Sequence, residues 1–326
     1  MTQNFLYPTL EHILDAEDKL MVVDGGARNG PVDLVGLYGL CQYHCFEPNP
    51  IELKSATWEI QNKIKDDAKR EPTTVYPYAL CGWSGTATLN ISIRPGSTST
   101  LEPNHELLAR FAVDNFSEMR EIVERLEVPA ISLADFMQQA SLNHIDFIKL
   151  DTQGNELDIL KSAGSFLQTT SVIMTEVEML PLYKDQALFH DVTAFLSSQG
   201  FELVDLRSNP TCRRFHARDD LPPSAYRMVW GDAFYARQLD NASKPRSLQQ
   251  GLILAGLGYA DIAIDLFQRN PAMSAKQKTN LEDFARWAAE PHWATGRIRR
   301  LLERTFGLLL QRYHWREGHQ VVSRKR

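Results

Sequence analysis

The chain has 326 residues, of which 43% are hydrophobic, so it can form one large domain or one domain with an appendage. No apolar run reaches the roughly 18 residues of a transmembrane helix, so the sequence predicts no transmembrane segment. The acidic N-terminus lacks the pattern of a secretory signal, and the 4 cysteines have no metal-binding spacing. We therefore expect a protein of the reducing cytoplasm that has no metal site.

The formal net charge of −6 is unevenly distributed along the chain. Residues 241–326 hold 15 Lys and Arg against 7 Asp and Glu, a net of +8, whereas residues 1–240 hold 20 against 34, a net of −14. An acidic body followed by a basic tail suggests two units, with a boundary near residue 240. We expect no nucleic-acid partner.

Segments with strand and helix patterns alternate through residues 1–240. The predicted strands lie at 20–23, 43–46, 74–80, 87–93, 145–150, 171–177, 201–206 and 227–235. The predicted helices lie at 31–40, from 49 onward, and at 102–127, 155–163 and 186–199. Pro31 would open the first helix, and Asn49 would cap the second in a capping box with Glu52. This alternation predicts an α/β fold with a parallel sheet covered on both faces, and it places ligands at the carboxyl ends of the strands.

A glycine-rich turn follows the first strand, in the stretch VVDGGARNGPV at residues 22–32. The turn contains Asp24, Gly25, Gly26, Asn29 and Gly30. It lacks the Lys and Ser/Thr of a P-loop, and it does not match GxGxxG. Because a carboxylate at Asp24 would repel a pyrophosphate, we expect a ligand that presents an ammonium or sulfonium group here.

Glu47 ends the second strand, 23 residues after Asp24. An acid at this distance is the usual acceptor for ribose hydroxyls in nucleotide-binding βαβ units. A ribose combined with an amino or sulfonium group describes S-adenosylmethionine. The alternative is that Asp24 and Glu47 are capping or surface acids.

Asp151 follows a third buried strand in the stretch HIDFIKLDTQGNELDILKSAG. It should emerge beside the ligand cleft, where Gly154 gives the backbone room and Gln153 and Asn155 offer amide groups. For Lys149, a structural ion pair with Asp151 is as good an interpretation as a direct role in binding.

Several motifs in the same order and spacing resemble the FkbM-type methyltransferase family across roughly residues 20–237. They are VVDGGARNG, FEPNP, PGSTSTLEP, the LADF helix start, IDFIKLDTQGNELDILKSAG and MTEVEMLPLYKDQALFHDVTAFLSSQGFELVDL. The resemblance implies a Rossmann-like class I methyltransferase fold, a mostly parallel sheet with helices on both faces, that uses S-adenosylmethionine. Family members typically methylate hydroxyl groups of sugars or secondary metabolites. Gln153 stands where the family often has a glutamate.

The resemblance also implies roles for individual residues. Asp24 and the turn at 25–30 would hold the methionine end of the cofactor, and Glu47 would hold its ribose. Ala79 and Leu80 would lie near the adenine, and Ser99 would help to close the site.

Methyl transfer to a hydroxyl needs a group that takes the hydroxyl proton. Glu176 is the first candidate for this base and Asp151 the second, because both follow buried strands. Further candidates are Glu178, His105, His190 and His216. No ligands at diagnostic spacing indicate a metal. The loops at 94–127 and 208–226 are expected to select the acceptor.

Beyond residue 240, the stretch SLQQGLILAGLGYADIAIDLFQRNP predicts two apolar helices around a Gly-x-Gly turn. A later helix would carry Ile298, Leu301, Leu302, Thr305 and Leu309 on one face and arginines elsewhere. These helices could form a cap on the first unit or on a second subunit, or dock an anionic partner.

The sequence therefore favours an S-adenosylmethionine-dependent O-methyltransferase acting on a glycan or a small hydroxylated metabolite. Two alternatives are a nicotinamide-dependent oxidoreductase and a non-catalytic protein that binds the cofactor or assembles through its helical tail.

Overall fold

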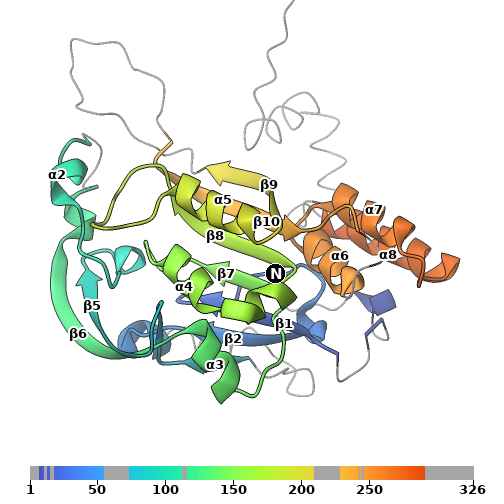
Figure 1. Ribbon diagram of the computed structural model, residues 1–326, viewed down its shortest axis with the longest axis horizontal. Helices are drawn as coiled ribbons and strands as arrows, with labels where there is room; N and C mark the ends of the chain where they lie inside the picture. The colour runs from blue at the N-terminus through green and yellow to red at the C-terminus, as the bar shows by residue number, and fades with distance from the viewer. Residues whose placement is uncertain are drawn as a thin grey trace, which may run out of the picture.

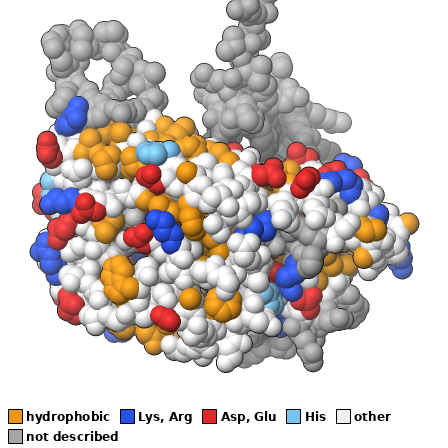
Figure 2. Space-filling view, viewed as in Figure 1, with side chains coloured by type: hydrophobic (Ala, Val, Ile, Leu, Met, Phe, Trp, Pro, Cys, Tyr) orange, Lys and Arg blue, Asp and Glu red, His pale blue; other side chains and the backbone are white. Residues whose placement is uncertain are grey.

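The computed structural model describes residues 7–10, 13–14, 18–54, 73–111, 116–208, 228–241, 243 and 246–290. Within these ranges no helix is both long and apolar enough to cross a membrane. On the face drawn in Figure 2, Lys and Arg side chains are mixed with Asp and Glu rather than gathered into a basic patch.

A seven-stranded sheet forms the centre of the molecule, in the order β3-β2-β1-β7-β8-β10-β9 (Figure 1). Its strands are β1 (Leu20–Gly25), β2 (Cys41–Phe46), β3 (Thr74–Tyr76), β7 (Phe147–Leu150), β8 (Val172–Glu178), β9 (Phe201–Ser208) and β10 (Trp230–Arg237). Strands β1, β2, β3, β7 and β8 run parallel, and β10 is antiparallel to both of its neighbours. This topology confirms the Rossmann-like class I methyltransferase fold, with the crossover between β1 and β7 where a ligand is expected.

Side chains of the central strands alternate between two hydrophobic cores. Val23 and Ile148 pack with helices α3 (Leu133–Gln139), α4 (Glu156–Ser162) and α5 (Phe189–Ser198). Val22 and Phe147 pack instead with α6 (Ser247–Gly256), α7 (Ala260–Arg269) and α8 (Ala275–Ala288). Both faces of the sheet are therefore covered, as a near-continuous apolar run in a parallel strand requires.

A smaller sheet lies beside the carboxyl ends of the central strands and has the order β4-β6-β5. It contains β4 (Ala79–Leu80), β5 (Gly85–Ser92) and β6 (Ile122–Ile131), so the strand expected at 74–80 is split between the two sheets. The helix predicted at 102–127 was wrong. Of the residues in this range that the structure describes, only α2 (His105–Leu108) and the 3-10 turn η5 (Glu118–Arg120) are helical, because the segment after them alternates with period two and pairs with β5.

The α-helix predicted at 31–40 was also wrong, since only the 3-10 turn η2 (Tyr38–Leu40) forms there. The Val32 N–H donates to the Asp24 carboxylate, and the Val35 N–H donates to the carbonyl of Gly256. In a helix that began at Pro31 the Val35 N–H would donate within the helix, but here it donates to α6 instead. The helix expected after Asn49 does begin at residue 50, but the Asn49 N–H donates to Glu47 rather than to Glu52.

The apolar hairpin expected after residue 240 is confirmed by α6 and α7, with Gly258 at a φ of 93° between them. The sequence analysis missed α8. The Gln250 side chain on α6 donates to the carbonyls of Ser171 and Arg237, at 3.1 and 2.8 Å, so the cap rests on this chain's own sheet. The basic helix predicted near residues 298–309 lies outside the described residues, and the division at residue 240 stays a prediction.

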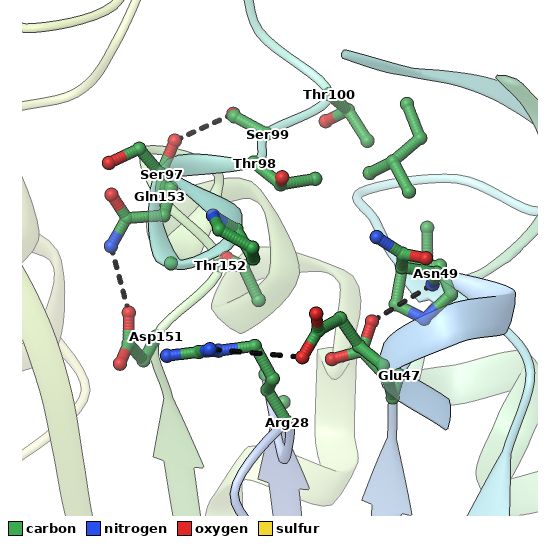
Figure 3. Close-up of a pocket in the computed structure, with 18 of the residues that line it drawn as sticks. Arg28, Glu47, Asn49, Ser97, Thr98, Ser99, Thr100, Asp151, Thr152 and Gln153 are labelled. Atoms are coloured by element: carbon green, nitrogen blue, oxygen red, sulfur yellow. Dashed lines mark hydrogen bonds and ion pairs between the residues drawn. The ribbon is translucent and has the colours of Figure 1, made fainter. Parts of the chain in front are cut away.

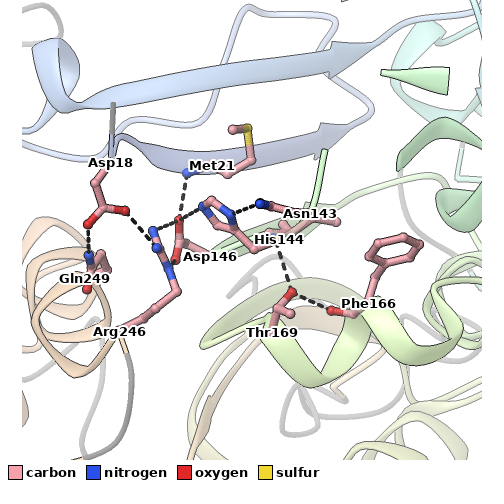
Figure 4. A network of polar contacts seen from close by, with 10 residues as sticks. Asp18, Met21, Asn143, His144, Asp146, Phe166, Thr169, Arg246 and Gln249 are labelled. Atoms are coloured by element: carbon pink, nitrogen blue, oxygen red, sulfur yellow. Dashed lines mark hydrogen bonds and ion pairs between the residues drawn. The ribbon is translucent and has the colours of Figure 1, made fainter. Parts of the chain in front are cut away.

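A polar network joins α6 to the start of β7 (Figure 4). Asp146 is fully buried, accepts the Met21 N–H at 2.8 Å and forms a bidentate pair with Arg246. Arg246 also bonds to Asp18 at 2.8 Å, and Asp18 accepts from Gln249 at 2.7 Å. The network lies at the amino ends of the strands, opposite the end where ligands are expected.

Candidate functional site

A cavity of about 580 Å³ opens at the carboxyl ends of β1, β2, β4, β7 and β8. The segment at 94–100, which contains the 3-10 turn η4 (Pro95–Ser97), forms one of its walls. This size suits a cofactor or drug-sized ligand. Of the predicted site residues, the cavity is lined by Gly25, Gly26, Asn29, Glu47, Ala79, Leu80, Ser99, Asp151 and Glu176.

Gly26 allows the turn after β1 to contact the backbone at the end of β7. Its φ is 87°, and a Cβ placed there would lie 2.1 Å from the carbonyl oxygen of Asp151. Gly30 also has a positive φ, of 88°, but it does not line the cavity. The glycines thus shape the turn, and only the first two reach the ligand space.

Asp24 lies beneath this turn and not in the cavity wall. It is 1% exposed, accepts the Val32 N–H at 2.7 Å, and has Lys149 Nζ 3.2 Å from Oδ1. Burial raises the pKa of Asp24 and Lys149 lowers it. Lys149 is therefore a structural ion-pair partner, 3.9 Å from Asp151 as well. A direct contact between Asp24 and a cationic ligand stays a prediction, and both of its oxygens have partners within the fold.

Glu47 faces the cavity from the end of β2 and is 6% exposed. One carboxylate oxygen accepts the Asn49 N–H at 2.9 Å. Burial raises the pKa of Glu47 to about 7. Ala79 and Leu80 line the same cavity from β4, so the predicted ribose and adenine residues do come together.

Arg28 extends across the cavity between Glu47 and Asp151 (Figure 3). Its guanidinium lies 3.7 Å from the Glu52 carboxylate and 3.4 Å from where a Cβ on Gly96 would be. The sequence analysis missed Arg28 as a site residue. Its place in the ARNG turn, four residues after Asp24, was the available signal.

Gln153 connects the two candidate catalytic acids. Its Nε2 donates to Asp151 at 2.9 Å and makes a short hydrogen bond to Glu176. Its Oε1 accepts from the Tyr183 hydroxyl at 2.9 Å, and its backbone carbonyl accepts from Ser99 at 2.7 Å. The φ of Gln153 is 61°, so these bonds hold a side chain in an uncommon backbone conformation.

Glu176 lies in a cluster of acids at the end of β8. Burial raises its pKa well above the usual carboxyl range, and Asp151, Glu178 and Glu156 raise it further. Glu156 is occupied by the loop before α4, because its carboxylate accepts the N–H groups of Thr152 and Gly154 at 2.7 and 2.9 Å. Glu176 alone of the three glutamates lines the cavity.

The remaining candidates for a base are not brought into the cavity. Glu178, His105 and His190 are absent from its lining, and His216 lies outside the described residues. In the part of the chain that the structure describes, no cluster of three metal-ligating side chains occurs.

The Methyltransferase FkbM domain matches residues 24–203, which is more than half of the chain and contains every lining residue named so far. This chain belongs to the FkbM methyltransferase family. The resemblance expected from the sequence motifs is confirmed. No curated protein matches the sequence.

Three solved structures are similar to this FkbM protein. Magnesium protoporphyrin IX methyltransferase from Synechocystis, with bound SAM, is 11% identical over 68% of this chain and 72% of its own, with a TM-score of 0.31. Precorrin-6y C5,15-methyltransferase from Geobacter metallireducens is 13% identical over 68% and 81%, with a TM-score of 0.29. Precorrin 8w decarboxylase from Methanobacterium thermoautotrophicum is 12% identical over 71% and 96%, with a TM-score of 0.30. The fold assignment rests on the strand order described above.

The FkbM domain thus places one acid over β2 and a pair of bridged acids over β7 and β8, at opposite sides of a single cavity. The Glu47 carboxylate uses one oxygen to accept the Asn49 N–H, so its other oxygen can accept hydrogen bonds from hydroxyl groups of a ligand. A carboxyl whose pKa is raised is a stronger base once it is ionised, so it can take the proton of an acceptor hydroxyl in that form. The arrangement can therefore bind a polyhydroxylated cofactor and deprotonate a second molecule beside it.

Proposed function

We propose that the protein transfers a methyl group from S-adenosylmethionine to a hydroxyl oxygen of a sugar or small hydroxylated metabolite. The observation that supports this most is the placement of Glu47 and Glu176 in one cavity on either side of the crossover between β1 and β7. Enzymes of this sheet type bind their ligands at that crossover.

The residues of the cavity fit this cofactor. Glu47 would accept the ribose hydroxyls, and Ala79 and Leu80 would pack against the adenine. Because Asp24 is occupied by Val32 and Lys149, we assign the ammonium of the methionine end to Asp151 and its carboxylate to Arg28. When bound, the cofactor supplies a methyl group already activated by the sulfonium.

The chain's own contribution is to orient the acceptor and take its proton. Glu176 accepts the Gln153 amide at Oε2, which leaves Oε1 to receive the proton of the acceptor hydroxyl. Gln153 holds this carboxylate and Asp151 in fixed positions, because its own amide is anchored by Tyr183. Alignment of this kind can lower the barrier of an in-line displacement substantially.

The test is calorimetric titration with S-adenosylmethionine, S-adenosylhomocysteine and NAD, followed by an assay for methyl transfer to hydroxylated acceptors. We expect both sulfur ligands to bind, Glu47→Gln to weaken binding at least tenfold, and the exposed control Asp158→Asn to bind normally. Glu176→Gln should bind the cofactor and lose turnover. Binding of NAD alone would favour an oxidoreductase, and cofactor binding without turnover on any acceptor would favour a non-catalytic protein.

We also propose that the protein works in the cytoplasm. Cys41, Cys45 and Cys81 are buried free thiols, which a reducing compartment preserves.

A further inference from the structure

The half of the cavity beyond β7 contains two arginines that the transfer mechanism does not use. Arg94 follows β5 and Arg120 ends η5, and both line the cavity together with Trp230 of β10. Their backbones are neighbours, since the Arg94 N–H donates to the carbonyl of Met119 at 3.0 Å. The cofactor residues Glu47 and Leu80 lie on the other half, over β2 and β4. The arginines therefore face the space left for the acceptor.

Arg120 is a buried cation that lacks a full set of partners. It is 7% exposed, its Nη1 donates to the carbonyl of Phe116, its guanidinium also hydrogen-bonds to the Tyr183 hydroxyl, and its Nε has no hydrogen-bond partner. Among the described residues no carboxylate forms an ion pair with it. Burial raises the pKa of its electrostatic neighbour Glu178 well above the usual range, and Arg120 lowers it. A buried cation that forms no ion pair is costly, and an anionic ligand would reduce that cost.

Arg94 is exposed, and its Nη1 contacts the sulfur of Met119 at 3.7 Å. Trp230 stacks on Phe116 with ring centroids 5.7 Å apart, and the Arg120 guanidinium lies 4.4 Å from the same Phe116 ring. Two guanidinium groups beside a flat apolar wall suit a ligand that combines a ring with a carboxylate or phosphate.

We propose that the methyl acceptor is an acidic hydroxyl compound, such as a uronic acid or a sugar phosphate, whose anionic group binds Arg94 and Arg120. The ring would lie against Trp230, and the hydroxyl to be methylated would face Glu176. This inference rests on the proposed function and adds the substrate class to it.

The experiment begins with protein saturated with S-adenosylhomocysteine, because that binding tests the cofactor site alone. Glucuronate, glucose and inorganic phosphate are then titrated as probes. Glucuronate carries a carboxylate at the position where glucose carries a hydroxymethyl group, so the pair tests the need for an anion. Phosphate tests whether an anion binds without a sugar ring. We expect glucuronate or phosphate to bind and glucose to bind at least tenfold more weakly.

Two variants and one control assign the anion site. Arg120→Gln and Arg94→Gln should each weaken anion binding about tenfold or more while the affinity for S-adenosylhomocysteine is unchanged. Arg94 is exposed, so its variant tests the inference even if Arg120→Gln does not fold. Arg125→Gln removes the same charge from β6, where Arg125 pairs with Glu102 outside the cavity, and should change nothing. Equal binding of glucose and glucuronate, no binding of either anion, or unchanged anion binding in Arg94→Gln would overturn the inference while leaving the cofactor site intact.

Discussion

Gly26 is the residue at which the turn after β1 lies directly against the backbone at the end of β7. An alanine there would adopt a φ of 87° and place its Cβ 2.1 Å from a backbone oxygen of Asp151. We predict that Gly26→Ala lowers the free energy of unfolding by roughly 3 kcal/mol or more, because both the backbone strain and the clash must be relieved. Gly164→Ala is the control, since its φ is 55° but nothing lies within 4 Å, and it should cost only about 1 kcal/mol. Chemical denaturation measures both, and equal losses would contradict the argument.

Glu47 should make cofactor binding depend on pH near neutrality. Its pKa is raised to about 7 by burial, so the acid is protonated below that pH and cannot accept ribose hydroxyls. Binding favours the ionised form, so affinity should fall by about tenfold between pH 7.5 and 5.5. Calorimetry with S-adenosylhomocysteine measures the dependence. Adenosine is the control ligand, because it has the ribose that Glu47 would bind but no amino acid group.

In Glu47→Gln the affinity should be weaker at pH 7.5 and nearly independent of pH. A wild-type affinity that does not change over this range would show that Glu47 does not meet the ribose.

Gln153 is a positioning residue for Glu176. Its amide donates to the carboxylate, which stabilises the charged form, so Gln153→Met should raise the pKa of Glu176 further. The pH at which methyl transfer becomes active should therefore move upward, together with a lower kcat. The surface variant Gln138→Met on α3 is the control. A lower kcat with an unshifted pH profile would indicate a purely structural role.

At the scale of elements, the cavity wall at 94–100 is held to the end of β7 by side-chain hydrogen bonds. The buried Tyr183 hydroxyl contacts both the Ser97 carbonyl and Gln153, each at 2.9 Å. We predict that Tyr183→Phe costs about 1–2 kcal/mol of stability and raises the acceptor KM. Tyr235→Phe is the control, because it removes a 2.8 Å hydrogen bond between the Tyr235 and Thr193 hydroxyls, and neither residue lines the cavity. It should lower the Tm similarly and leave KM unchanged, so equal KM values in both variants would contradict the prediction.

The elements that the sequence predicted well are those whose pattern is local. The buried strand β7, the turn at Asp151 and helix α4 follow one another as expected, because apolar run, glycine and helix period occur within twenty residues. The predictions failed at 31–40 and 102–127. In the first, backbone N–H groups donate to the Asp24 carboxylate and to the Gly256 carbonyl, which both lie outside the segment. In the second, the strand β6 owes its form to pairing with β5.

The same distinction applies to the site. Glu47 and Asp151 follow β2 and β7, and Glu176 lies near the end of β8 in the same sheet, so the topology alone brings the three together. The pairing of Asp24 with Lys149 could not be predicted from the sequence, because it requires the register between β1 and β7. Arg28 and Arg120 reach the cavity through long side chains from a turn and from η5, and no sequence period indicates such a direction.

At the scale of the whole molecule, the Asp146–Arg246 pair links the sheet to the C-terminal helices. Arg246→Met would leave a fully buried carboxylate without its cation, so we predict a loss of about 2–4 kcal/mol in the free energy of unfolding. Arg286→Met removes an exposed i,i+4 pair with Glu282 and should cost less than about 0.5 kcal/mol. The double variant Asp146→Asn with Arg246→Met should recover part of the loss, and a fully additive loss would show that the pair is not coupled.

The order of strands in the sheet determines when the molecule can be completed during synthesis. Strand β9 is made before β10, yet β10 lies between β9 and the rest of the sheet, so β9 has no neighbour until residues 230–237 have left the ribosome. The Asp146 carboxylate stays without its cationic partner for longer, because Arg246 is synthesised 100 residues later. The FkbM match ends at residue 203, within β9. A nascent chain of that length has no partner strand for β9, and it lacks the helices α6, α7 and α8 that cover one face of the sheet. The strand that joins β9 to the rest of the sheet, β10, therefore lies outside the family match.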